Sequence, residues 1–318
     1  MTAPDNLGAM PRSSSSVAAA RNPVGTHIKV GKGLVEEVLP KAAAIGAEVL
    51  QIFTGNPRGW TPAKPDPRKD QAFRDGCREA GIRVFVHAPY LVNVGSPTPL
   101  TYERSVAAVA HNLMRAAQTG AEGVVVHTGS CVGEGGYDAA MRQVREGLLP
   151  VLDALGDDGP FLLLESTAGQ GRSLCATVED HAAYLEALDH HPRVGLCLDT
   201  CHMFAAGEPL DEPGGATATV DRLLEIAGQD RLKLVHANDS MDVRGAFRDR
   251  HQKLGEGHLG LTAFRELLAH PATEGVPFVL ETPGSRELDD PQIPLLKLLR
   301  EEASAARVTT VRTGARAS

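Results

Sequence analysis

The chain lacks any long hydrophobic run, and this absence excludes a membrane-spanning helix. No apolar stretch approaches the roughly 20 residues that cross a bilayer. The opening segment, MTAPDNLGAMPRSSSSVAAARNP, contains no apolar run of the kind found in a secretory signal. We therefore expect a protein that does not enter a membrane and that is cytoplasmic.

Cysteine is also scarce. There are five cysteines, an odd number, and without a secretion signal this favours reduced thiols over a disulfide framework. Cys197 and Cys201 are four residues apart, which is not the CxxC spacing of a zinc ribbon, so we expect them to be packing residues.

An excess of positive charge is missing as well. The formal net charge is −8, which taken alone argues against a nucleic-acid partner. Bound divalent cations would make this balance less negative, by two charges for each ion. Basic residues on loops expected at one rim would then make a local positive surface on an acidic protein; they are Arg58, Arg244, Arg248, Arg250 and Lys253.

The length of 318 residues, 42% of them hydrophobic, allows a large core. Eight short apolar runs rich in Val, Leu and Ile recur along the chain, and they do not alternate strictly between apolar and polar residues. This is typical of strands buried on both faces of a parallel sheet. The runs are 27–30, 49–54, 84–89, 123–129, 161–167, 195–200, 232–238 and 278–284.

Helical patterns follow these runs, for example at 102–121, 138–156 and 177–189, where Thr177 and Asp180 resemble a capping box. Eight alternations of strand and helix over about 260 residues predict a single (β/α)₈ TIM barrel, an α/β fold, with a doubly wound sheet as the alternative. We place the barrel domain at residues 25–302, between flexible tails at 1–24 and 303–318.

Six consecutive predicted strands end in a histidine or a carboxylate. Because parallel strands end at one mouth of a barrel, these groups should converge there, and buried charges of this kind are costly unless they bind a metal. The sequence therefore predicts a metal site at the C-terminal rim of the strands. The six residues are His87, His127, Glu165, Asp199, His236 and Glu281.

Two short patterns add further ligands: DTCH supplies His202, and RDRH supplies Asp249 and His251. Nine candidate ligands are too many for one zinc ion, which binds about four groups, and suit three ions if one carboxylate bridges. The other histidines are interpreted as ordinary structural residues, most of them on predicted helices; they are His27, His111, His181, His190, His191, His258 and His270.

Five motifs of this sequence resemble endonuclease IV, a family of zinc-dependent apurinic/apyrimidinic endonucleases, and the similarity runs from Thr26 to Glu302. The motifs are HAPYLVNVGSP (87–97), LLESTAGQG (163–171), VGLCLDTCHMFAAG (194–207), LVHANDS (234–240) and DRHQKLGEGHLG (249–260).

The resemblance implies three zinc ions per chain. It assigns one ion to His87, His127 and Glu165, a second to Glu165 as the bridge with Asp199, His236 and Glu281, and a third to His202, Asp249 and His251. It implies base excision repair of double-stranded DNA by a monomer: a zinc-bridging hydroxide cleaves the phosphodiester 5′ of an abasic site, leaves a 3′-hydroxyl, and damaged 3′ ends are also trimmed. Glu165 and Glu281 are the catalytic carboxylates in this interpretation.

The resemblance also assigns DNA contacts to Arg58, Tyr90 and Leu91, which would wedge into a kinked duplex where the abasic nucleotide is flipped out. The sequence departs from the family pattern at Lys29 and Lys32, at 208–214 and at Met241. These departures concern DNA affinity and leave every predicted metal ligand in place.

Two other functions fit parts of the pattern. A xylose-isomerase-like sugar isomerase or epimerase would need Glu165, Asp199, His236 and Glu281, but has no use for His202, Asp249 and His251. A non-catalytic protein that binds damaged DNA would be expected to have lost ligands, and none is lost.

Overall fold

A closed barrel of eight parallel strands forms the centre of the protein in a computed structural model that describes residues 22–132 and 135–314. Neighbouring strands follow the order β1-β10-β7-β6-β5-β4-β3-β2, which confirms the predicted TIM barrel. The strands are β1 (Val24–Ile28), β2 (Val49–Ile52), β3 (Arg83–His87), β4 (Gly123–His127), β5 (Phe161–Glu165), β6 (Val194–Asp199), β7 (Leu232–His236) and β10 (Phe278–Leu280).

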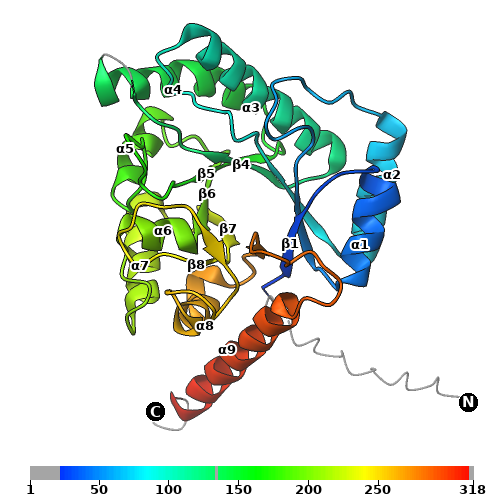
Figure 1. The fold of residues 1–318 in the computed structure, drawn as a ribbon, viewed down its shortest axis with the longest axis vertical. Coiled ribbons are helices and arrows are strands. Elements are labelled where there is room, and N and C mark those ends of the chain that lie inside the picture. Colours follow the sequence, from blue (N-terminus) through cyan, green and yellow to red (C-terminus); the bar gives the residue numbers. More distant parts are fainter. Residues whose placement is uncertain (1–21, 133–134, 315–318) are drawn as a thin grey trace, which may run out of the picture.

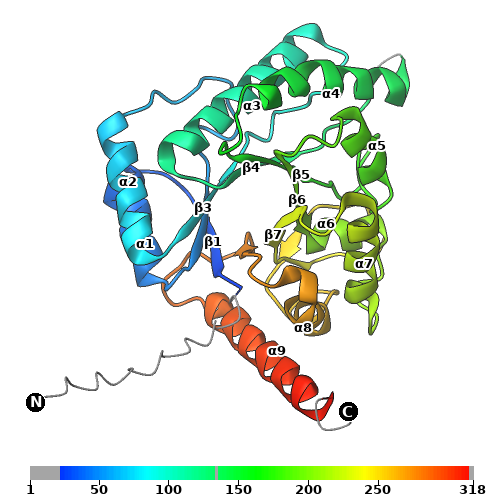
Figure 2. The same ribbon diagram turned by 180° about the vertical axis from the view of Figure 1, so that it is seen from behind.

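Helices surround this barrel on its outside (Figures 1 and 2). A two-stranded ribbon, β8 (Asp239–Ser240) with β9 (His251–Gln252), stands apart from the barrel sheet. The helical elements are η1 (Leu34–Val38), α1 (Leu39–Ala44), α2 (Pro67–Ala80), α3 (Pro99–Thr119), α4 (Gly136–Asp153), α5 (Asp180–Ala187), α6 (Thr200–Ala206), α7 (Gly215–Ala227), α8 (Leu261–Ala269), η2 (Pro271–Thr273) and α9 (Gln292–Gly314).

Local sequence explains where several helices begin. The Asp66 carboxylate accepts hydrogen bonds from the backbone N–H groups of Arg68 and Lys69 and so caps α2. The expected capping box before α5 is present: the N–H of Asp180 donates to Thr177 Oγ1, and the N–H of Thr177 donates to Asp180 Oδ2. In the described part of the chain, none of the helices is long and apolar enough to span a membrane.

One layer of buried side chains fills the interior of the barrel. Because side chains alternate between the two faces of a strand, the residue two positions further along each strand also points inward. That next layer lies nearer the C-terminal ends of the strands and consists of polar groups, as described below. The apolar layer is formed by Val49, Phe85, Val125, Leu163, Cys197, Leu234 and Val279.

The first strand is where the prediction from sequence was wrong. We expected it at 27–30, but β1 runs from Val24 to Ile28. Gly25 and Thr26 hid its start because neither is a large apolar residue. The shift moves His27 from the beginning of the strand to its C-terminal end.

The ends of the barrel domain also differ from the expected boundaries. The described structure begins at residue 22, where the buried Asn22 amide donates to the carbonyl of Val276 at 3.0 Å. At the other end, α9 continues past residue 302 to Gly314, because EEASAAR consists largely of good helix formers. Of the expected flexible tails at 1–24 and 303–318, residues 1–21 and 315–318 lie outside the described residues.

Candidate metal centre

All nine predicted ligand residues gather at one mouth of the barrel. A cavity of about 460 Å³ opens over them, lined by six of the nine together with Tyr90. Seven of the nine ligand residues lie at strand ends or in the first turn of α6, Asp249 lies just before β9, and His251 is the first residue of β9. The predicted ligands fall into three groups, each with its candidate ligand atoms within 4.8 Å of one another.

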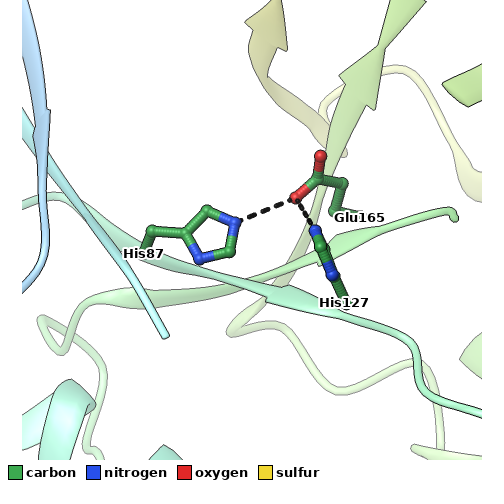
Figure 3. A group of neighbouring side chains, drawn as sticks. All are labelled: His87, His127 and Glu165. Carbon is green, nitrogen blue, oxygen red and sulfur yellow. Dashed lines mark ion pairs between the residues drawn. The ribbon is translucent and has the colours of Figure 1, made fainter. Parts of the chain in front are cut away.

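The first group joins three neighbouring strands. The Nε2 atoms of His87 and His127 each lie 3.3 Å from Glu165 Oε2, and Figure 3 shows both imidazoles pointing at that oxygen. This oxygen is buried and has no hydrogen-bond partner among the described residues. A tetrahedral zinc ion with bonds of about 2.0–2.1 Å holds its ligand atoms roughly 3.3 Å apart, so each nitrogen lies at the distance from this oxygen that a shared zinc ion would require.

A second group repeats this spacing. The Nε2 atoms of His202 and His251 each lie 3.2 Å from Asp249 Oδ1. Both nitrogens are buried, and within the described chain neither has a hydrogen-bond partner. Unpaired buried nitrogens cost free energy, and a bound cation would satisfy them.

The third group lies deepest. His236 Nδ1 is 3.0 Å from Glu165 Oε1, 3.3 Å from Glu281 Oε2 and 3.7 Å from Asp199 Oδ2. Glu165 therefore offers one oxygen to this group and the other to His87 and His127, which is the arrangement of a bridging carboxylate.

The shifted pKa values of two side chains show that the mouth of the barrel favours positive charge. Burial alone would raise the pKa of Glu165, but the imidazoles of His236 and His127 lower it well below its usual range. Burial would lower the pKa of His251, yet Asp199 and Asp249 raise it to about 9. Glu165 thus stays ionised, and the protein must balance its charge with protons or with metal ions.

Local sequence places the ligands of the second group. Asp199 caps α6 by accepting the N–H of His202, which sets His202 in the first turn of that helix. The ribbon of β8 and β9 pairs Ser240 with His251 and brings the latter over the mouth.

The GEG segment of the motif DRHQKLGEGHLG is organised by a buried carboxylate. Asp239 accepts hydrogen bonds from the backbone N–H groups of Gly255, Gly257, Leu259 and Gly260. A Cβ at Gly257 would lie 2.3 Å from the carbonyl oxygen of Ser240, so only glycine fits there. This loop therefore holds the neighbouring β9 in place.

Sequence reasoning missed three residues of the mouth. Gln51 and His27 lie in the same inward-facing layer as the predicted ligands, and Gln51 Nε2 lies 3.0 Å from His27 Nδ1. Asn238 donates to Asp199 Oδ2 at 2.7 Å and accepts the N–H of Glu281 at 2.8 Å. A buried glutamine in the apolar run VLQIF was a signal that the sequence contained.

The residues predicted to touch DNA stand at the rim of this cavity. The Tyr90 side chain is 51% exposed, and its ring packs edge-on against Phe53 and His87, at centroid distances of 5.2 and 5.5 Å. Burial of its hydroxyl, and then the charge of Glu281, raise the pKa of Tyr90 to about 12, so the phenol is neutral at physiological pH.

Leu91 and Arg58 are exposed beside it. The N–H of Tyr90 donates to the carbonyl of Pro57 at 3.0 Å, which joins the loop of Arg58 to the loop of Tyr90 and Leu91. The three predicted DNA contacts therefore belong to two loops that are linked to each other.

The basic residues expected at the rim differ in whether they have an acidic partner. Arg244 pairs with Glu212 and Asp211, Arg248 and Arg250 pair with Asp242, and Lys253 pairs with Asp290. These acidic neighbours weaken the positive surface that we expected from the sequence. That expectation took no account of acidic residues on adjacent loops. Arg58 has no ion pair within the described residues. The departing residues Lys29, Lys32 and Met241 are exposed.

Comparison with known proteins identifies the family to which this chain belongs. Residues 39–307 match the family model of the xylose isomerase-like TIM barrels. The chain is 51% identical to a protein of Streptomyces coelicolor named "Probable endonuclease 4", over 92% of this chain and 100% of that protein. A protein of the same name from Methanoculleus marisnigri is 36% identical over 84% of this chain and 94% of its own length.

Among solved structures, endonuclease IV from Thermus thermophilus aligns with a TM-score of 0.77 and 34% identity, covering 88% of this chain and 99% of that chain. A D-tagatose 3-epimerase-like protein aligns with a TM-score of 0.67 at 18% identity, over 91% and 99% of the two chains, which reflects the shared barrel alone. The protein described here belongs to the endonuclease IV family.

Proposed function

We propose that the protein is a DNA-repair hydrolase that cuts double-stranded DNA 5′ of an abasic site, leaves a 3′-hydroxyl and trims blocked 3′ ends, with three zinc ions bound at the barrel mouth. The observation that carries this proposal is the separation of nine ligand residues into three groups with zinc-like spacing. Glu165 would bridge two of the ions, and His202, Asp249 and His251 would hold the third.

The group of His202, Asp249 and His251 also separates this proposal from a sugar isomerase. Glu165, Asp199, His236 and Glu281 alone would suffice for one or two metal ions acting on a sugar. A further group built from α6 and β9, with two unpaired buried nitrogens, has no role in such a reaction. The cavity is also bordered by the exposed aromatic ring of Tyr90, which suits a nucleic-acid wedge.

When bound, zinc lowers the pKa of coordinated water towards neutrality and stabilises negative charge on phosphate oxygens. The side chains of the protein prepare the place where this chemistry occurs. Glu165 is fully buried, and four imidazoles lie within 3.3 Å of its two oxygens, so it stays ionised. The side chain of Glu281 is 14% exposed and lines the cavity, which places its carboxylate where it can orient an attacking water molecule.

Recognition of the lesion would depend on the linked loops of Arg58 and Tyr90. An abasic step lacks one base and its stacking, so it costs less to kink than an intact step. Tyr90 and Leu91 would occupy the unstacked gap, and Arg58 would contact the displaced strand or its phosphates. Among the described residues no acidic partner faces Arg58, which distinguishes it from Arg244, Arg248, Arg250 and Lys253, each of which has one.

The decisive experiment combines metal analysis of the purified protein with incision of a duplex that carries one abasic analogue. We expect about three zinc ions per chain, a single cut 5′ of the analogue, and a product end that a DNA polymerase extends. An intact duplex serves as the control substrate. A zinc-loaded protein that leaves the abasic duplex uncut would overturn the proposal.

We further infer that the protein acts as a monomer in the cytoplasm. The five cysteines are buried and free, in agreement with a reducing compartment. All nine predicted ligands come from one chain, so the site needs no second subunit. Sedimentation of the zinc-loaded protein with and without DNA tests the oligomeric state.

A further inference from the structure

Gln51 is fully buried at the mouth of the barrel, and its amide contacts two of the predicted zinc ligands. Its Nε2 lies 2.6 Å from Glu281 Oε1, and its Oε1 lies 2.8 Å from His236 Nε2. The position follows from strand geometry, because Gln51 is two residues beyond the interior side chain of Val49 on β2.

The orientation of this amide is determined by Glu281. An ionised carboxylate can only accept hydrogen bonds, so the NH₂ group of Gln51 must face it. The reverse orientation would place two acceptor oxygens 2.6 Å apart. The carbonyl oxygen of Gln51 therefore faces His236, and since this oxygen is also only an acceptor, the hydrogen between them belongs to His236 Nε2.

A neutral imidazole carries a hydrogen on one nitrogen and a lone pair on the other. With the hydrogen on Nε2, the lone pair of His236 is on Nδ1, which is the atom that faces Glu165, Glu281 and Asp199. We infer that Gln51 is a positioning residue: it holds His236 in the tautomer whose Nδ1 binds the cation, and it holds Glu281 beside that atom. This inference rests on the proposed metal centre.

His27 completes the arrangement from the neighbouring strand. Its Nδ1 lies 3.0 Å from Gln51 Nε2 and can accept the second hydrogen of the amide. The amide is thereby held from three sides, by His27, His236 and Glu281, so its rotation about the last side-chain bond is blocked. Outer-shell partners of this kind commonly contribute 10- to 100-fold to metal affinity.

The first test needs no substitution. Nitrogen–proton NMR correlation on zinc-loaded protein labelled with ¹⁵N-histidine reports which ring nitrogen of His236 carries a hydrogen. We expect a hydrogen on Nε2 that exchanges slowly with solvent. A hydrogen on Nδ1, or no ring hydrogen, would overturn the inference even if the enzyme binds three zinc ions and cuts DNA.

The second test compares zinc affinity, by competition with a chelator, in Gln51→Leu and in the control Thr26→Val. Thr26 is equally buried in the barrel, but its hydroxyl contacts the Leu280 carbonyl and Ser285 instead of a predicted ligand. We expect about 10- to 100-fold weaker binding of one zinc ion in Gln51→Leu and wild-type affinity in Thr26→Val. Equal affinities for Gln51→Leu and wild type would contradict the inference.

Gln51→Glu separates the two contacts of the amide. Its carboxylate still accepts the hydrogen of His236 Nε2, but it repels Glu281. We expect the Nε2 hydrogen to remain visible in Gln51→Glu and to exchange rapidly in Gln51→Leu. Loss of zinc by the wild-type protein would instead count against the proposed function, so the two failures are distinguishable.

Discussion

His202 Nε2 lies 3.2 Å from Asp249 Oδ1, although the two residues belong to separate segments, α6 and the chain before β9. This contact belongs to the group of His202, Asp249 and His251, for which a nuclease has a use and a sugar isomerase has none. Asp249→Asn keeps the shape of the side chain and removes its charge. We expect the variant to bind about two zinc ions in place of three and to cut abasic DNA on the order of 100- to 1,000-fold more slowly, because charge stabilisation by one ion is lost.

Elemental analysis and single-turnover incision measure these two effects. Glu212→Gln is a matched control, since Glu212 is an acidic residue at the same rim that pairs with Arg244 and contacts none of the predicted ligands. A variant Asp249→Asn that retains three zinc ions would remove Asp249 from the ligand set.

Glu281→Gln tests the catalytic carboxylate. The substitution is isosteric and Glu281 lies at the end of β10, so we expect the far-ultraviolet circular dichroism spectrum to be unchanged. Incision should fall at least about 100-fold, because the metal group around His236 loses one negative charge and the attacking water loses its acceptor. Cleavage at the wild-type rate, measured under single-turnover conditions, would contradict the assigned role.

Most of the metal centre could be predicted from sequence, and the reason is geometric. His87, His127, Glu165 and Asp199 each end an apolar run, and in a parallel barrel all such ends meet at one mouth. The sequence therefore determines their proximity once the strands are located. Asp249 and His251 were predicted as ligands from the short pattern RDRH, but only the resemblance assigned them to one ion with His202, because the ribbon that follows Asp249 is not part of the barrel sheet.

His27 and Gln51 are two residues of the mouth that were not predicted from the sequence. With β1 placed three residues late, His27 appeared to lie at the wrong end of a strand and was interpreted as structural. Gln51 was overlooked because only charged groups and imidazoles were considered as members of the site. Counting two residues on from the interior positions Gly25 and Val49 would have found both, but the interior face of each strand is visible only in the folded barrel.

Arg58 and Tyr90 should affect the choice of substrate more than the metal centre. We expect the double variant Arg58→Ala with Tyr90→Ala to retain three zinc ions and to lose about 10- to 100-fold in its preference for abasic over intact duplex, which corresponds to the loss of one stacking contact. Competition binding with both duplexes measures this ratio. Leu298→Ala, which removes an exposed apolar side chain from α9, is the control. Unchanged discrimination in the double variant would exclude the wedge.

A buried ion pair joins α9 to the residue that precedes β2. Arg300 on α9 is buried and donates to Glu48 Oε2 at 2.5 Å and to the Asn22 carbonyl at 2.7 Å, and the N–H of Val24 also donates to Glu48. Burial alone would raise the pKa of Glu48, but the hydrogen bond from Arg300 lowers it below its ordinary value of 4.5.

A carboxylate with a lowered pKa in the folded state stabilises the protein above its unfolded-state pKa, and this contribution is lost as the pH falls through the folded-state value. We expect Glu48→Gln to lower the free energy of unfolding by about 1–3 kcal/mol at pH 7, because the buried Arg300 loses its counter-ion. The difference from wild type should shrink as the pH falls below 4.5, where Glu48 is protonated first in the unfolded state, and should vanish below the lowered pKa, where Glu48 is protonated in both states. Urea unfolding of the two proteins, compared in the same metal state at each pH, measures this difference.

Glu122→Gln, which breaks the half-exposed pair with Arg83, is the control and should change the free energy of unfolding by less than about 1 kcal/mol. A difference for Glu48→Gln that stays constant from pH 7 to pH 4 would show that packing, and not charge, explains the effect.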